Sequence, residues 1–331
     1  IVLTPKWGCS MRIHTQVKLS GEENKLDPPA SVFSIGSCFS ACIPRHLERS
    51  KFAVFSNPCG TTYNPISIGN QIKALCAKSI LSSEFCFEGE IYPMEHHGSF
   101  HKKTVEEQNR NIFEVWKKAQ AVCDQSQILL VTLGTAFVFD LEDRVVNNCH
   151  RLPAKLFQER LLAVSEVVEA LEKPLKEWLQ QNESRRVVLT VSPVRHLRNG
   201  LQGNALSKST LRVACKDLTL DSRCLYFPAY EIMNDELRGY RFYKDDLLHP
   251  SELAEQLIWE RFRDWILSEK AALIERKVLK LDRTLAHRFQ GQPDQRWINA
   301  LRSRMEQLER EHPELDWSKE RLRCEQRILN Q

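Results

Sequence analysis

The 331-residue sequence lacks several patterns that would assign it to a specialised class of protein. Its eleven cysteines include no C-x-x-C pair, and their spacing matches neither a zinc site nor a disulfide framework. It has no apolar run long enough to span a bilayer and no charged-then-apolar signal peptide. Its net charge of +4 is small for this length, so nothing in it calls for a nucleic acid or an anionic membrane as partner. We therefore expect a cytoplasmic protein with reduced cysteines.

The composition that remains is that of an ordinary globular protein. Hydrophobic residues make up 42% and charged residues 27% of the chain. This length accommodates one large α/β domain and a smaller module. The printed chain begins at Ile1, and Met11 is a candidate translation start. Because residues 20–29 are polar and end in Pro-Pro, we predict a mobile lead-in over residues 1–30.

Short apolar runs alternate with amphipathic segments from residue 31 to residue 267. The runs that we predict to be strands are 31–35, 53–55, 128–134, 187–191 and 225–227. The segments that we predict to be helices are 65–78, 106–123, 157–182, 207–220 and 251–267. The run 128–134 is apolar almost throughout, which is typical of a strand that is covered on both faces. The pattern predicts one domain over 31–267, with a mostly parallel sheet between two helical layers.

The tail over residues 268–331 has a different pattern. It is rich in Lys, Arg and Glu, and it has no strand signal. One apolar stripe at helical spacing runs over 274–289, and another runs over 298–308, beyond a Gly-Gln-Pro break at 291–293. These stripes predict a helical extension that packs as a hairpin on the main domain or on a partner, either another protein or a second copy of the chain.

The first chemical signal is Gly36-Ser37-Cys38, directly after the predicted strand 31–35. A strand that turns on a glycine into a helix presents a side chain at the sheet edge and leaves backbone N–H groups free. Ser37 is therefore a candidate nucleophile, although a small residue is also common there for packing alone. Cys38 is an alternative nucleophile, but a cysteine in a packed layer is more often an inert small hydrophobe.

The second signal is Asp246-x-x-His249, just before the predicted helix 251–267. In one tight turn this spacing lets the carboxylate of Asp246 accept a hydrogen bond from the imidazole of His249. The other ring nitrogen is then free to act as a base. The alternative is a surface aspartate in a loop that caps the next helix. Together with the distant Ser37, the order Ser…Asp-x-x-His favours a catalytic interpretation.

A set of ordered motifs closely resembles the bacterial GSCFA family over about residues 30–265. The motifs are Gly36-Ser37-Cys38-Phe39, Asn57-Pro58-Cys59-Gly60, Tyr63-Asn64-Pro65, Leu133-Gly134-Thr135, Asn148-Cys149-His150, Ser192-Pro193-Val194-Arg195-His196, the run from Tyr230 to Arg238, and His249-Pro250-Ser251. This family is similar to the SGNH (GDSL-type) superfamily of esterases and acetyltransferases. The resemblance implies a three-layer α/β/α, flavodoxin-like fold.

The resemblance also implies roles for individual residues. Ser37 matches the nucleophile of the superfamily, and its own N–H matches one oxyanion donor. Gly60 matches the glycine whose N–H is the second donor. Asp246 and His249 match the dyad, with His249 as base and Asp246 as the residue that orients it. The chain has Ser40 where the name motif has alanine, and we expect this hydroxyl not to touch the mechanism.

One position departs from the superfamily pattern. Where the superfamily has Gly-x-Asn, this chain has Gly134-Thr135-Ala136, and Ala136 cannot donate the third hydrogen bond to an oxyanion. A missing oxyanion donor typically costs a factor of about a hundred or more in rate. The candidates to replace it lie in loops that we expect at the same edge of the sheet. They are Asn64, Asn148, Arg195 and His196.

Further polar residues have two interpretations each. Arg195 either binds a substrate carboxylate or phosphate, or pairs with an acid that holds its loop. His96, His97 and His101 invite a metal interpretation, but no carboxylate or cysteine lies at ligand spacing, which favours a solvated or lid loop. His150 either lines the pocket or hydrogen-bonds a turn. We expect no metal and no cofactor.

The sequence leaves two functional hypotheses open. The first is a serine-dependent esterase or O-acyltransferase that acts on a small acyl ester, such as an acetyl ester, of a carbohydrate by superfamily analogy. The second is a catalytically inactive binding or scaffolding module on the same fold. In that case the missing asparagine marks lost catalysis, and the helical tail docks a protein partner.

Overall fold

A five-stranded parallel sheet forms the centre of the molecule. The computed structural model describes residues 15–20, 25–219, 222–286 and 295–329. The strands run in the spatial order β10-β9-β5-β1-β2, and every pair of neighbours is parallel. Their bounds are β1 Ser31–Gly36, β2 Ala53–Ser56, β5 Ile128–Leu133, β9 Arg186–Val191 and β10 Cys224–Tyr226. The predicted mostly parallel sheet is confirmed, and each predicted strand corresponds to one of these five.

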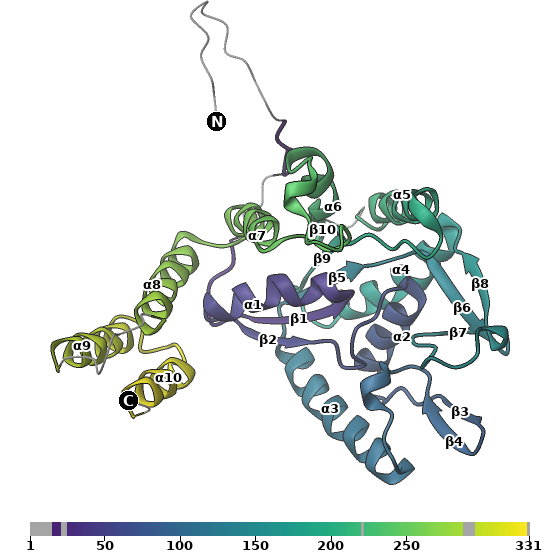
Figure 1. The fold of residues 1–331 in the computed structure, drawn as a ribbon, viewed down its shortest axis with the longest axis horizontal. Coiled ribbons are helices and arrows are strands. Elements are labelled where there is room, and N and C mark those ends of the chain that lie inside the picture. Colours follow the sequence, from purple (N-terminus) through teal and green to yellow (C-terminus); the bar gives the residue numbers. More distant parts are fainter. Residues whose placement is uncertain (1–14, 21–24, 220–221, 287–294, 330–331) are drawn as a thin grey trace, which may run out of the picture.

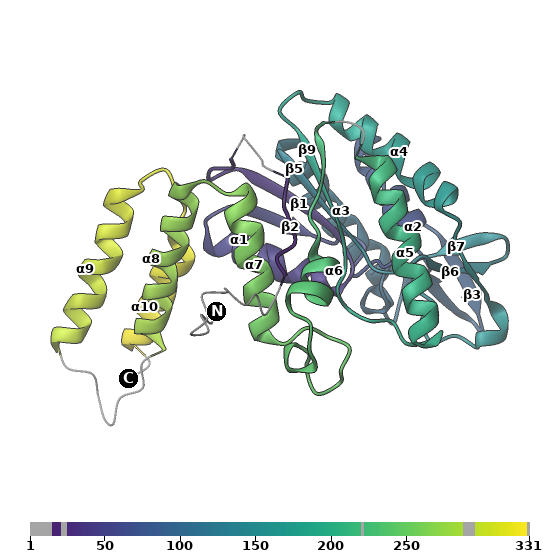
Figure 2. The same ribbon diagram turned by 90° about the horizontal axis from the view of Figure 1, so that it is seen from above.

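Helices cover both faces of this sheet (Figures 1 and 2). One face packs on α2 Pro65–Cys76, α3 Val105–Gln125, α4 Val164–Gln180 and α5 Gly200–Leu218. The other packs on α1 Cys42–Arg49, the short α6 Ala229–Glu231 and α7 Glu252–Ile266. Alternate residues of a strand belong to the hydrophobic cores on the two faces of the sheet. Phe33 and Ile35 lie in the core beneath α2–α5, and Val32 lies in the core beneath α1, α6 and α7. The predicted three-layer α/β/α architecture is therefore confirmed.

Two small antiparallel sheets flank the α2 side of the domain. One is the hairpin of β3 Glu84–Phe87 and β4 Glu90–Pro93, and the other is the three-stranded sheet of β6 Phe137–Leu141, β7 Arg144–Val146 and β8 Gln158–Leu161. The helix predicted over 157–182 is therefore wrong in its first turn, because residues 158–161 pair with β6. The apolar spacing of Leu161 and Val164 fits both structures, and the strand partner decides between them.

The described part of the C-terminal tail holds three helices rather than the predicted two. They are α8 Glu269–Leu285, α9 Gln295–Glu311 and α10 Ser318–Leu329. These helices have a hydrophobic core of their own, separate from the two cores of the sheet. In Figure 2 they stand beside the main domain next to α1 and α7. The predicted packing of this tail on the main domain is thus present.

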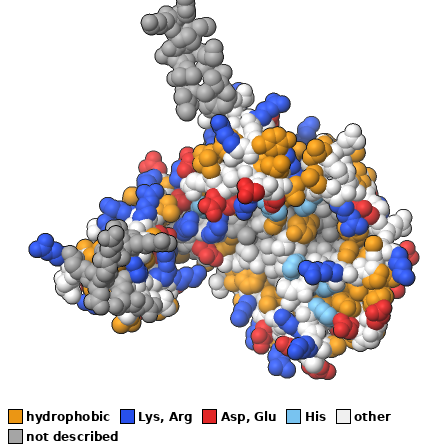
Figure 3. Space-filling model, in the orientation of Figure 1, with side chains coloured by type: hydrophobic (Ala, Val, Ile, Leu, Met, Phe, Trp, Pro, Cys, Tyr) orange, Lys and Arg blue, Asp and Glu red, His pale blue; other side chains and the backbone are white. Residues whose placement is uncertain are grey.

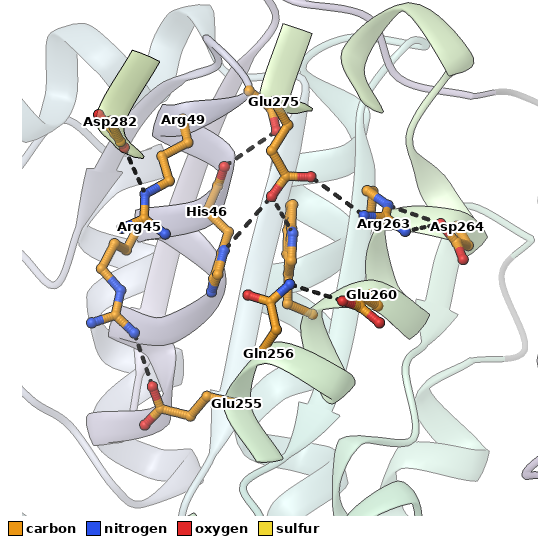
Figure 4. A network of polar contacts seen from close by, with 12 residues as sticks. Arg45, His46, Arg49, Glu255, Gln256, Glu260, Arg263, Asp264, Glu275 and Asp282 are labelled. Atoms are coloured by element: carbon orange, nitrogen blue, oxygen red, sulfur yellow. Dashed lines mark hydrogen bonds and ion pairs between the residues drawn. The ribbon is translucent and has the colours of Figure 1, made fainter. Parts of the chain in front are cut away.

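A buried polar network joins α8 to the main domain (Figure 4). Glu275 of α8 is 1% exposed, and its Oε1 accepts a 2.6 Å hydrogen bond from Trp259 Nε1 of α7. Arg263 Nη1 lies 3.6 Å from the other carboxylate oxygen. His46 of α1 stacks on Trp259, with 4.8 Å between the ring centroids, and its Nδ1 lies 3.8 Å from Glu275 Oε1. One carboxylate therefore contacts side chains from both helices that it faces.

Part of the predicted lead-in is attached to the domain. Most of its residues lie outside the described part of the chain. Leu26 is buried, its N–H donates to Ile266 O at 2.9 Å, and its carbonyl accepts from Ser268 N. Across the described residues, we find no helix with the length and apolarity that a membrane crossing requires.

Candidate functional site

The candidate residues come from loops that follow the carboxyl ends of the parallel strands. Ser37 follows β1, Gly60 and Tyr63 follow β2, Gly134 follows β5, and His196 follows β9. In a parallel sheet these ends lie at one edge, which is where ligands bind in open α/β folds. Backbone bonds tie the loops together, because Tyr63 O accepts from the N–H groups of Gly134 and Thr135 at 2.9 and 3.0 Å.

The turn after β1 begins one residue later than the sequence predicts. β1 ends at Gly36, which pairs with Thr132 of β5, and Ser37 N donates to Thr132 O at 3.1 Å. The N–H of Ser37 is therefore engaged and does not serve as an oxyanion donor in this structure. The side chain of Ser37 is fully buried, and its Oγ has no hydrogen-bond partner among the described residues.

Cys38 is the second residue after β1. It begins the 3₁₀ turn η1 Cys38–Ala41, and its side chain is partly exposed. Burial raises the pKa of the Cys38 thiol, whereas the amide of Phe39 and the charge of Lys208 lower it in part. The thiol packs at the edge of the α1–α7 core, as predicted for a small hydrophobe, but it keeps access to solvent.

Asn57 holds this turn in place. Its Oδ1 accepts from Gly36 N at 2.8 Å, and its Nδ2 donates to Ser40 Oγ at 2.9 Å. Its own φ is +53°, a left-handed conformation that Asn tolerates better than most residues. The hydroxyl of Ser40 is therefore one hydrogen bond away from the residue that fixes the Gly36 turn, which is closer to the site than we expected from the sequence.

Two residues of α5 fix the loop after β5, and sequence reasoning missed both. Ser207 Oγ accepts from Ala136 N at 2.7 Å. Lys208 is fully buried, and its Nζ donates to Gly134 O at 2.6 Å and to Ser192 O at 2.8 Å. Burial lowers the pKa of Lys208 to about 7, while the nearby Cys38 acts in the opposite direction. A lysine inside an amphipathic helix gives no sequence signal of burial, because the same residue is ordinary on a solvated face.

The Asp246–His249 pair forms as the sequence predicts. Asp246 Oδ2 lies 2.7 Å from His249 Nδ1, and its Oδ1 accepts from the N–H groups of His249 and Leu248. These two amides, followed by the imidazole, lower the pKa of Asp246 to about 2, so the carboxylate is ionised at neutral pH. His249 Nε2 has no hydrogen-bond partner among the described residues, and no hydrogen bond joins it to Ser37 or Cys38.

Of the predicted oxyanion or substrate-binding residues, Gly60 and Asn64 have their donors engaged elsewhere, and Asn148 lines another cavity. Gly60 N donates to Asn57 O at 2.8 Å within a turn. Asn64 is the N-cap of α2: its Oδ1 accepts from Ser67 N, and its Nδ2 donates to Ser67 Oγ. Asn148 Oδ1 accepts from His150 N, and its side chain lines a separate cavity near His97. The structure therefore does not offer these groups to a substrate at the Ser37 turn.

Of the residues predicted to replace the missing donor, His196 lies among the loops of the site and has a ring nitrogen without a hydrogen-bond partner. Its ring meets Tyr63 edge to face at 5.4 Å, and its buried Nε2 has no partner among the described residues. Burial first, and then the charges of Lys208 and His249, lower the pKa of His196 to about 4. The imidazole is therefore neutral at pH 7 and carries one N–H.

Arg195 faces a cavity of about 420 Å³, which is otherwise lined by residues between Met233 and Tyr243. Its guanidinium lies over Tyr243 at 4.0 Å and over Tyr240 at 5.6 Å. Its backbone N–H donates to Leu248 O, next to His249. Arg195 therefore holds the loop of the dyad through a backbone carbonyl and not through an ion pair with an acidic side chain of a described residue. In the face shown in Figure 3, hydrophobic and basic side chains lie side by side over α6 and the segment after it.

The histidines of the 96–101 loop do not form a metal site in the described part of the chain. His96 is buried, and its Nε2 accepts from Trp116 Nε1 at 3.0 Å. His97 caps η2 Gly98–Phe100, and His101 stacks on Tyr92 at 4.4 Å. His150 Nε2 lies 3.0 Å from Pro93 O. This contact fits the interpretation in which His150 hydrogen-bonds a turn.

Comparison with known proteins identifies the family. The model of the GSCFA family matches residues 31–262, and the chain belongs to this family. No curated protein matches the chain.

Several solved carbohydrate esterases are similar at low identity. A carbohydrate esterase family 3 protein from Talaromyces cellulolyticus is 11% identical, with a TM-score of 0.33 over 75% of this chain and 99% of its own. A family two carbohydrate esterase from Clostridium thermocellum is 12% identical, with a TM-score of 0.33 over 78% of this chain and 67% of its own. A carbohydrate esterase family 2 enzyme from Corynascus thermopiles is 11% identical, with a TM-score of 0.35 over 78% of this chain and 69% of its own.

Proposed function

We propose that this member of the GSCFA family is an esterase or O-acyltransferase of SGNH type that acts on small acyl esters. The observation that carries the proposal is the Asp246–His249 pair, with a 2.7 Å contact at Nδ1 and an unengaged Nε2. This arrangement fixes the imidazole through one nitrogen and leaves the other free to accept a proton. The dyad is partly exposed, so a substrate reaches it from solvent.

The nucleophile in this proposal comes from the turn after β1. The sequence assigns that role to Ser37, by resemblance to the superfamily. His249 takes a proton from the nucleophile, which attacks the carbonyl carbon and forms an acyl-enzyme. His249 then protonates the departing alcohol. Water or an acceptor hydroxyl attacks the acyl-enzyme in the second half of the reaction, and its proton goes to His249.

His196 is the replacement that we propose for the missing donor at Ala136. Its neutral ring has a buried Nε2 with no partner among the described residues, beside the loops that carry Tyr63 and Gly134. A donor that is fixed before the reaction is worth most where water is excluded. His249 is also close enough for its charge to contribute to the lowered pKa of His196.

The alcohol part of the ester occupies the cavity beside Arg195 in this proposal. Tyr240 is 66% exposed at its rim, and Arg238 lines the same wall. Aromatic faces and guanidinium groups are suited to the flat apolar faces and the hydroxyls of a sugar. We therefore propose a carbohydrate ester as the substrate class.

The test is a screen of purified protein against p-nitrophenyl acetate and acetylated sugars, with His249→Ala beside wild type. His101→Ala is the matched control, because His101 lies on a loop away from the dyad and stacks on Tyr92. We expect turnover by wild type and by His101→Ala, and a loss in His249→Ala. A folded wild type with no turnover of any ester would instead favour the inactive binding module.

A further inference from the structure

We propose that Cys38, rather than Ser37, carries the acyl group. This inference rests on the proposed function and concerns the identity of its nucleophile. Its first support is the register of the sheet. Although β1 ends at Gly36, Ser37 N still donates to Thr132 O of the neighbouring strand β5. Cys38 is the first residue of the 3₁₀ turn η1, and its amide donates to no backbone carbonyl of a described residue.

The direction of the Ser37 side chain is the second support. A Cβ built on Gly134 would lie 3.1 Å from Ser37 Cβ and 3.1 Å from Tyr63 Cδ1. Ser37 therefore packs against the backbone of the loop after β5, with the ring of Tyr63 at the same point. Its hydroxyl is fully buried there. A substrate carbonyl would have to displace these loops to reach Ser37, whereas Cys38 is already partly exposed.

The surroundings of the thiol are the third support. The amides of Cys38 and Phe39 both act on the sulfur in the direction that favours a thiolate. The buried ammonium group of Lys208 acts in the same direction. Lys208 forms no ion pair with any carboxylate of a described residue, and its hydrogen bonds go to two carbonyls. Because burial lowers the pKa of Lys208 to about 7, the amine is only partly charged at neutral pH, and a negative charge on the Cys38 sulfur favours its charged form.

The thiol still needs a base, because burial outweighs these effects and keeps it protonated at neutral pH. His249 Nε2 takes the proton from sulfur, and the thiolate adds to the ester carbonyl. The C–O bond then breaks, the imidazolium gives its proton to the departing alkoxide, and a thioester on Cys38 remains. In the second half, an acceptor hydroxyl or water gives its proton to His249 and attacks the thioester. The thiolate leaves and regains the proton.

The experiment traps the acyl-enzyme. Full-length protein is mixed with p-nitrophenyl acetate, quenched in acid within the first turnover and mapped by peptide mass spectrometry. Half of each sample is treated with neutral hydroxylamine, which cleaves thioesters much faster than ordinary esters. The variants are Cys38→Ala, Cys38→Ser and Ser37→Ala. Cys86→Ala is the matched control, since Cys86 is an exposed cysteine on β3, away from the site.

The proposal predicts a hydroxylamine-sensitive acetyl group on Cys38 in wild type, Ser37→Ala and Cys86→Ala. The acylation rate should fall about a hundredfold or more in Cys38→Ala and stay within about threefold of wild type in Cys86→Ala. A stable acetyl ester on Ser37, unaffected by Cys38→Ala, would overturn the Cys38 assignment and leave the esterase proposal intact. If folded wild type acetylates at neither residue, both proposals fail. The acetylated residue found in wild type distinguishes Cys38 from Ser37 even if a variant does not fold.

Discussion

At the scale of single residues, several polar groups of the domain are neutral because they are buried. His96 accepts a hydrogen bond from Trp116, and it does so only as neutral imidazole. Burial, with a smaller contribution from His150, lowers the pKa of His96 to about 4. Between pH 6.5 and 4 the unfolded chain therefore binds a proton that the folded chain does not. The free energy of unfolding must fall as the pH falls through this range.

We predict that His96→Gln removes part of this dependence. Glutamine keeps an acceptor for Trp116 but does not titrate. Urea unfolding of both proteins at a series of pH values is the measurement. The stability of wild type relative to His96→Gln should decline by roughly 3 kcal/mol at most between pH 6.5 and 4. A difference that stays constant across this range would show that the pKa of His96 is the same in the folded and the unfolded chain.

At the scale of elements, the turn between β1 and η1 sets the geometry of the candidate site. Gly36 has φ +149°, and a Cβ on it would lie 2.2 Å from Thr132 O. That oxygen also accepts from Ser37 N, so it cannot move without breaking the ladder. A side chain at this position would therefore separate β1 from β5 at the end that carries the site.

We predict that Gly36→Ala destabilises the protein by more than about 3 kcal/mol, because strain and a backbone clash coincide. Gly89→Ala is the control, since Gly89 also has a positive φ of +85° but nothing lies within 4 Å of its added Cβ. We expect that change to cost only about 1 kcal/mol. Equal losses in the two variants, measured by urea unfolding, would show that the close approach to Thr132 is unimportant.

The turn between β1 and η1 also shows which parts of the fold and of the site can be predicted from the sequence. The apolar runs place all five strands of the central sheet, and the spacing of Asp246 and His249 predicts their contact. The bond from Ser37 N to Thr132 O is not predictable, because it depends on the register with β5, which is far away in the sequence. Lys208 was missed for a similar reason: its burial comes from two strand-end carbonyls that no local pattern reveals.

At the scale of the whole molecule, the C-terminal helices contact the main domain through polar side chains on and just after α1 and on α7. Lys51 pairs with Glu320 of α10 and lies over the ring of Trp317 at 4.4 Å. Glu275 of α8 provides the buried contact with Trp259 and Arg263. Because α1 follows the turn that carries Cys38, the docking of α8 on α1 also supports the helix behind the candidate site.

We predict that Glu275→Ala lowers the free energy of unfolding by about 2–4 kcal/mol, because it leaves Trp259 Nε1 without its buried acceptor and removes the ion pair with Arg263. Arg321→Ala is the control, since its pair with Glu309 is exposed and should be worth less than about 1 kcal/mol. Denaturant unfolding, followed by tryptophan fluorescence, is the measurement. A loss below about 1 kcal/mol in Glu275→Ala would show that this network does not hold the helices.

The most direct test of the account as a whole is kcat/KM for an acetyl ester in wild type, His249→Ala and Asp246→Asn. If His249 is the base, its removal should lower kcat/KM by about 10²–10⁴, with no loss of folded structure by circular dichroism. Asp246→Asn should also lower kcat/KM, because it removes the charge that orients the imidazole. Hydrolysis by His249→Ala at the wild-type rate would contradict the central claim that this dyad and the strand-end turn form an acyl-transfer site.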